Sequence, residues 1–251
     1  MGKNKFNFLV VGFILLIIGY VVFKTFNIYF YNVNSVMYDS YSKFSKGLVI
    51  KDTVSIKTQK LDKEKYLSFN NIKIRNDFKK YTKLKQTEED YNLIKYVLYD
   101  DNGKVKASFW MGETKTYLDM FKSNSKEYGL NDIRFKTINK NYFLEENNIS
   151  DDLDLVKYII KHKNSKKNIF TSVHDIKKDY MIKYFAASNL PSLESITEVT
   201  GDYRGFIFNS SNDLKEVSIL KNNKRYFFIF IKLDYFSDNY IKELLNTVII
   251  N

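Results

Sequence analysis

The first hydrophobic feature of the chain is an uninterrupted apolar segment from Phe6 to Phe23, which contains no charged residue. An α-helix of this length rises about 27 Å, which matches the hydrocarbon thickness of a bilayer. Bulky aromatic residues follow the segment, where a signal peptide would carry small residues around its cleavage site. The pattern therefore predicts a single transmembrane helix over residues 6–26 that contacts the lipid bilayer and is not cleaved.

The charges on either side of this helix predict its orientation. Residues 1–5 form a short tail with the amino group, Lys3 and Lys5, whereas Lys24 is the one basic residue close behind the apolar segment. Positively charged flanks tend to stay in the cytoplasm, and long domains are exported largely regardless of their own charge. We expect a cytoplasmic tail and a C-terminal domain outside the cell membrane.

The chain behind the helix is expected to form a stalk over residues 27–46 and one soluble domain over residues 47–251. Its hydrophobic content of 44% is enough to build a core. No linker rich in Pro, Gly or Ser divides the chain after residue 47. One domain is therefore predicted rather than two.

Alternation of apolar and polar residues predicts strands at both ends of this domain. The first two runs cover 52–60 and 66–78, and the clearest hairpin covers 93–111 with a tight turn at Asn102-Gly103. After the middle of the domain, four further strands are expected at 196–200, 204–208, 217–221 and 225–232.

Helical periodicity occupies the middle of the domain and its C-terminal end. The expected helices cover 114–123, 150–163, 173–187 and 237–246. Ser172 with Asp175 and, separately, Ser237 have the spacing of residues that cap a helix N-terminus. The order of strands, helices and again strands, without regular βαβ alternation, predicts an α+β fold with a mainly antiparallel sheet and about four helices.

Charge and composition limit the partners. The formal net charge is +11, but the lysines are spread along the chain and the sequence contains only four arginines. A nucleic-acid interface would need clustered basic residues, preferably arginines, so no nucleic-acid partner is expected. Another envelope protein or an anionic surface polymer remains as a partner. The excess of Lys, Asn, Ile, Phe and Tyr is typical of an AT-rich, bacterial genome.

Residues that could carry catalysis or bind a cofactor are scarce. The chain has no cysteine and only His162 and His174, which excludes disulfides, thiol nucleophiles and three-histidine metal sites. Ser172, His174 and Asp175 are adjacent at a helix start, whereas a catalytic triad unites separate segments. No catalytic residue, metal site or cofactor is predicted.

The best candidate for a binding edge is the segment Gly201–Phe206, which places Tyr203 and Arg204 beside two glycines. Trp110, the only tryptophan, is a second candidate. The hypothesis is a membrane-anchored extracytoplasmic binding or accessory module without enzymatic activity. Two alternatives stay open, namely a membrane-tethered hydrolase with acid or serine groups dispersed in the sequence, and a cytoplasm-facing subunit of a membrane complex.

Overall fold

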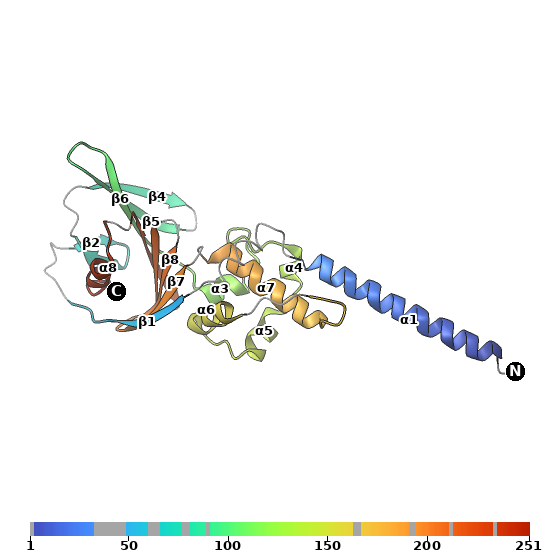
Figure 1. The fold of residues 1–251 in the computed structure, drawn as a ribbon. Coiled ribbons are helices and arrows are strands. Elements are labelled where there is room, and N and C mark those ends of the chain that lie inside the picture. The colour runs from blue at the N-terminus through green and yellow to red at the C-terminus, as the bar shows by residue number, and fades with distance from the viewer. Residues whose placement is uncertain are drawn as a thin grey trace.

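The computed structural model describes residues 3–32, 49–59, 66–76, 81–88, 91–162, 167–190, 194–210, 213–232 and 235–251. The molecule is elongated, with the N-terminal helix at one end, a layer of helices in the middle and the sheet at the other end (Figure 1). An apolar N-terminal helix precedes a domain with a mostly antiparallel sheet and several helices, so the predicted α+β class is confirmed.

Helix α1 (Lys3–Phe30) is long and apolar enough to cross a membrane over Phe8–Phe30. The large apolar side chains between residues 8 and 23 are exposed, as expected for a surface that lipid would cover. The helix also continues through 27–30, where the sequence analysis placed a stalk. Tyr31, directly behind the helix, is buried in a hydrophobic core with residues of the later helices.

The main sheet has eight strands in the order β1-β7-β8-β9-β10-β6-β5-β4. All its pairs are antiparallel except β1 with β7. The strands are β1 (Val49–Ile56), β4 (Tyr81–Glu88), β5 (Tyr91–Tyr99), β6 (Val105–Thr114), β7 (Ser195–Gly201), β8 (Arg204–Ser210), β9 (Leu214–Lys221) and β10 (Lys224–Ile231). A smaller sheet contains β2 (Tyr66–Phe69), β3 (Ile72–Arg75) and β11 (Ile249–Ile250).

The predicted hairpin around Asn102-Gly103 is confirmed as the antiparallel pair β5 and β6. Gly103 has a positive φ of 75°. The Asp100 side chain accepts hydrogen bonds from the backbone N–H groups of Asn102 (3.0 Å) and Lys104 (2.9 Å). This carboxylate therefore stabilises the turn, as short polar side chains do in tight turns.

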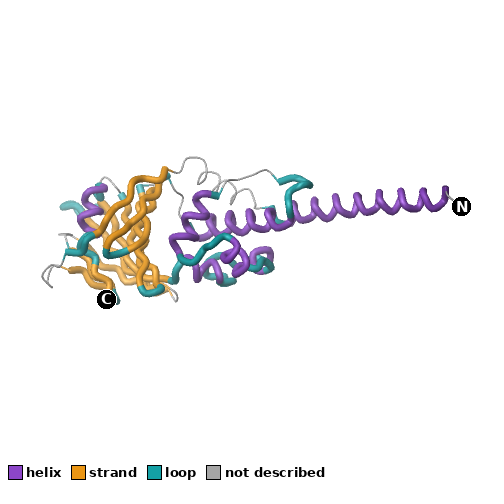
Figure 2. Tube along the Cα trace, turned by 90° about the horizontal axis from the view of Figure 1, so that it is seen from below, coloured by secondary structure: helices purple, strands orange, loops and turns teal. Residues whose placement is uncertain are grey.

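The sheet separates two hydrophobic cores, because successive side chains of a strand point to opposite faces. On β8, Phe206 and Phe208 lie in the core shared with the helical layer, while Ile207 lies in the other core. That second core is covered by the small sheet and helix α8 (Asp238–Leu245). Figure 2 shows the strands between the helical layer and α8.

The helical layer contains α3 (Tyr117–Lys122), α4 (Ile133–Lys136), α5 (Lys140–Glu146), α6 (Asp152–Lys161) and α7 (Val173–Asn189). With α1 and α8, the described residues hold seven helices, so the expected number of about four is wrong. Helices α4 and α5 were missed because four and seven residues are too few to show a period of about 3.6. The predicted caps Ser172 and Ser237 are confirmed, since each accepts a hydrogen bond from a backbone N–H inside its helix.

Candidate functional site

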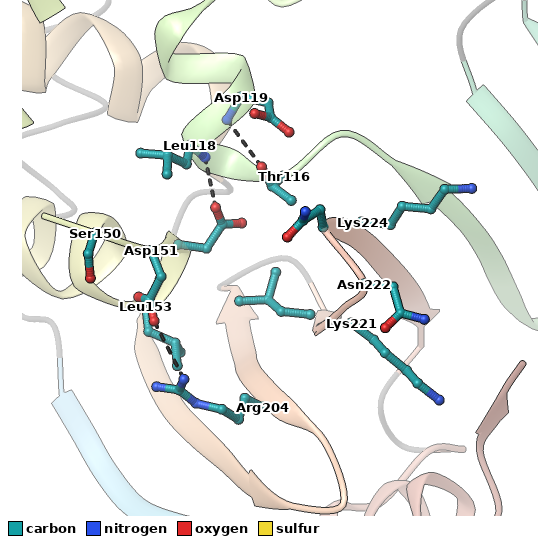
Figure 3. Close-up of a pocket in the computed structure, with 13 residues that line it drawn as sticks. Thr116, Leu118, Asp119, Ser150, Asp151, Leu153, Arg204, Lys221, Asn222 and Lys224 are labelled. Carbon is teal, nitrogen blue, oxygen red and sulfur yellow. Dashed lines mark hydrogen bonds and ion pairs between the residues drawn. The ribbon is translucent and has the colours of Figure 1, made fainter. Parts of the chain in front are cut away.

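A surface cavity of about 440 Å³ lies where the helical layer meets the sheet (Figure 3). Its walls come from the starts of α3 and α6, the start of β8 and the turn between β9 and β10. The charged residues that line it are Asp119, Asp151, Asp152, Arg204, Lys221 and Lys224. Because these segments are distant in sequence, the cavity exists only in the folded chain.

The β9–β10 turn forms one wall through Asn222 and Asn223, whose φ angles are 53° and 57°. Two consecutive positive φ values give the tight hairpin turn that suits the right-handed strand twist, and asparagine tolerates them well. The lysines on either side are engaged elsewhere. Lys224 Nζ lies 3.0 Å from Glu113 Oε1, and Lys221 Nζ donates to the Ile250 carbonyl oxygen at 2.5 Å.

Arg204 and Asp151 contact each other at the surface of the cavity. Asp151 caps α6 by accepting a hydrogen bond from the Asp154 N–H at 2.9 Å. Its other carboxylate oxygen, Oδ2, lies 3.5 Å from Arg204 Nη1. The side chain of Asp151 is 43% exposed and that of Arg204 is 63% exposed, so water weakens their attraction to about 1 kcal/mol or less. Both groups are therefore available to a ligand.

The cavity floor is fixed by Asp152. Its carboxylate accepts hydrogen bonds from the backbone N–H groups of Tyr117 (2.7 Å) and Leu118 (2.8 Å), which the first turn of α3 leaves unpaired. Burial raises the pKa of Asp152, while the two hydrogen bonds act in the opposite direction. The start of α6 is thereby joined to the start of α3.

A buried polar network beneath the floor joins α3 to the sheet. The Arg225 guanidinium lies 4.1 Å from the centre of the Tyr117 ring, and its Nη1 lies 3.6 Å from Glu216 Oε1. The Tyr117 hydroxyl is 3.1 Å from Ser218 Oγ, and burial raises the pKa of Tyr117. Charge and hydrogen bonding therefore hold the cavity floor in one arrangement.

The three residues predicted to bind do not lie together. Tyr203 is buried on the opposite face of the sheet from Arg204, in the core with α8. Its hydroxyl donates to the Val248 carbonyl oxygen (3.1 Å) and accepts from the Ile250 N–H (3.2 Å), which fastens β11. Of the three, only Arg204 lines the cavity.

Trp110 lies further along the sheet. The strand register places Arg204, Leu220, Arg225 and Thr114 in one row across four strands, and Trp110 is four residues before Thr114 on β6. Four residues of a strand span about 13 Å, so Trp110 is remote from the cavity. It is half-buried beneath Lys95, whose Nζ is 4.9 Å from the ring centre.

The segment Gly201–Phe206 forms the predicted turn between two strands, here β7 and β8. Gly201 has a φ of 102°, and a Cβ at this position would lie 2.2 Å from the Ile56 carbonyl oxygen. The Asp202 carboxylate accepts a hydrogen bond from the Thr58 N–H at 2.7 Å. The close approach of β1 explains the glycine.

Ser172, His174 and Asp175 form a helix start, as predicted. Ser172 Oγ accepts from the Asp175 N–H at 2.9 Å. His174 Nε2 instead lies 3.0 Å from Glu146 Oε2 on α5. In the described part of the chain, no group of three or more His, Cys, Asp or Glu side chains is arranged to hold a metal ion.

A second buried charge cluster, which the sequence analysis did not single out, surrounds Asp179 on α7. Its Oδ1 lies 2.9 Å from His162 Nε2 and 3.5 Å from Lys167 Nζ, and its Oδ2 lies 2.7 Å from Lys183 Nζ. Asp179 on α7 therefore links α7 to two other parts of the chain, namely His162 at the end of α6 and Lys167 before α7. The i,i+4 spacing of Asp179 and Lys183 could be seen in the sequence, but the burial of Asp179 and its contacts with His162 and Lys167 could not.

Comparison of the chain with known protein families and with curated proteins finds no match.

Proposed function

We propose that the protein is a single-pass protein of the cell membrane whose folded part lies outside the cytoplasm and acts as a non-enzymatic binding or accessory module. The observation that carries this proposal is the end of α1, which is both the end of an apolar helix and a part of the domain core. An anchor built in this way holds the folded part close to the bilayer.

The contacts at the end of α1 favour a retained anchor over a cleaved leader. Arg134 Nη1 donates to the carbonyl oxygens of Phe30 (3.2 Å) and Asn32 (3.0 Å). The Tyr31 ring packs edge-on against Tyr180 of α7, with ring centres 5.7 Å apart. Cleavage directly behind Phe23 would leave these contacts close to a new chain end, without the helical turns of α1 that precede them.

The cavity supports binding and indicates the kind of ligand. Among its lining residues, Asp119 and Asp151 are carboxylates at its surface, and Arg204 is a cation that contacts Asp151. A ligand with a cationic group beside an anionic group would satisfy both signs. A peptide segment of another envelope protein therefore fits better than an anionic polymer.

The location is tested by a reporter fused behind Asn251. The short tail with Lys3 and Lys5 favours a cytoplasmic N-terminus. A reporter that is active only after export should therefore work at the C-terminus, and a reporter that is active only in the cytoplasm should not. The opposite pair of results would place the folded part in the cytoplasm and make it a cytoplasm-facing subunit of a membrane complex.

A further inference from the structure

The turn that precedes α7 lies directly beside α1. The Tyr20 hydroxyl donates to the Ile169 carbonyl oxygen at 3.3 Å, and the Lys24 ammonium donates to the Thr171 carbonyl oxygen. Tyr20 and Lys24 belong to one face of α1, because residues four apart are neighbours on a helix. Asn27 and Tyr31 continue this face into the buried end of the helix.

These contacts place the turn at the level of the membrane boundary. Lys5 and Lys24 flank the uncharged segment, so the hydrocarbon layer ends near Phe23 on the side of the domain. Tyr20 lies three residues deeper, which is about 4.5 Å along the helix axis. Helical side chains also tilt toward the N-terminus, so the Tyr20 hydroxyl is expected at least as deep in the membrane as the Tyr20 backbone.

The turn presents a large apolar side chain at this level. Phe170 is 83% exposed. Asn168 holds the turn, since its Oδ1 accepts from the Phe170 N–H (2.9 Å) and its carbonyl oxygen accepts from the Thr171 N–H (3.0 Å). Exposure of Phe170 thus results from a hydrogen-bonded turn. Contact of this side chain with water is unfavourable, whereas lipid around it would remove its apolar surface from water.

We infer that the turn Asn168–Thr171 is a second membrane contact, which inserts Phe170 into the outer boundary of the bilayer that α1 crosses. The inference rests on the proposed membrane-anchored state. Apolar side chains at the boundary of headgroups and acyl chains stabilise membrane contacts of this kind. A second contact beside α1 also restricts tilting of the folded part relative to the bilayer plane, so the cavity keeps a defined height above the membrane.

The absence of cysteine allows each position to be tested with one spin label on the full chain. The labelled variants are Phe170→Cys, Leu15→Cys for the acyl layer, Tyr235→Cys for water and Ile133→Cys as the matched control. Ile133 is a large exposed side chain like Phe170, but its neighbour Arg134 contacts the chain at Phe30 and Asn32, beyond the boundary. All variants are reconstituted into vesicles of phosphatidylethanolamine and phosphatidylglycerol.

Accessibility to oxygen, which concentrates in acyl chains, is compared with accessibility to a water-soluble nickel chelate. We expect oxygen to exceed the chelate several-fold at residues 15 and 170 and the reverse at residues 133 and 235. A label at 170 that behaves like 235 while 15 stays in lipid would overturn the membrane contact and leave the anchor intact. A label at 170 that is shielded from both reagents would assign Phe170 to a protein contact and would also overturn it. Chelate access at residue 15 would contradict the anchor itself.

Discussion

Replacing Asp179 with asparagine is expected to lower the free energy of unfolding by about 3–5 kcal/mol, because the change removes the charge of a buried carboxylate that pairs with the buried Lys183 side chain. The side chains of Asp179 and Lys183 are only 7% and 6% exposed, and their charged atoms lie 2.7 Å apart. His162 and Lys167 lose the same partner. The ends of α6 and α7 should loosen together. Urea unfolding of the full chain in detergent micelles measures the effect.

The matched control for this prediction is Asp175→Asn, one turn earlier on the same helix. Asp175 is exposed and its carboxylate accepts a hydrogen bond from the Ser172 hydroxyl, so about 1 kcal/mol or less is expected. Equal losses for the two variants would mean that the cluster around Asp179 adds nothing beyond an ordinary surface carboxylate.

The cluster around Asp179 should also make the stability of the folded chain depend on pH. Burial acts to raise the pKa of Asp179, but the hydrogen bonds from His162 and Lys183 and the nearby lysine charges outweigh it and lower the pKa. A lowered pKa in the folded state means that the stabilisation is complete above the unfolded value of about 3.9 and is lost as pH falls through the folded value. The Asp179→Asn variant should therefore lose less stability than the unmodified chain between about pH 5 and pH 2.

The second large effect is expected for Arg225→Ala, which should also cost about 3–5 kcal/mol because it removes a buried guanidinium and leaves the largely covered Glu216 carboxylate without its cation. The side chains of Arg225 and Glu216 are 9% and 14% exposed. The variant also removes the guanidinium that stacks on Tyr117, so α3 should detach from the sheet more easily. Urea unfolding followed by circular dichroism measures the loss.

Arg204→Ala is the matched control, since Arg204 lies in the same cross-strand row but at the cavity surface. Its pair with Asp151 is exposed, and about 0.5 kcal/mol or less is expected. The two arginines thus separate a structural role from a binding role. A large loss of stability for Arg204→Ala would show that the cavity wall depends on Arg204 and would remove the argument that this residue is available to a ligand.

The sequence predicted the elements whose signals are local. The apolar run of α1, the turn at Asn102-Gly103 and the caps Ser172 and Ser237 each depend on a few neighbouring residues, and the structure contains all of them. The parallel pairing of β1 with β7 joins segments about 145 residues apart and has no local signal. The short helices α4 and α5 were missed because they are too short to show a helical pattern of their own, and their contacts with the core come from distant segments.

The candidate site was predictable only in part. Tyr203 and Arg204 are neighbours in sequence, but adjacent residues at the start of a strand point to opposite faces, so only one of them could reach a surface cavity. Which one does so depends on the second core, which fills the face of Tyr203. The opposing Asp151 comes from a helix start 53 residues away, which sequence spacing alone does not bring close.

The most direct measurement of the central claim is the intact mass of the protein recovered from membranes after an alkaline wash. If α1 is a retained anchor, the washed membranes should hold the protein, and its mass should include the whole apolar segment from Phe6 to Phe23. Recovery of the protein in the wash, or of a chain that lacks this segment, would contradict the account.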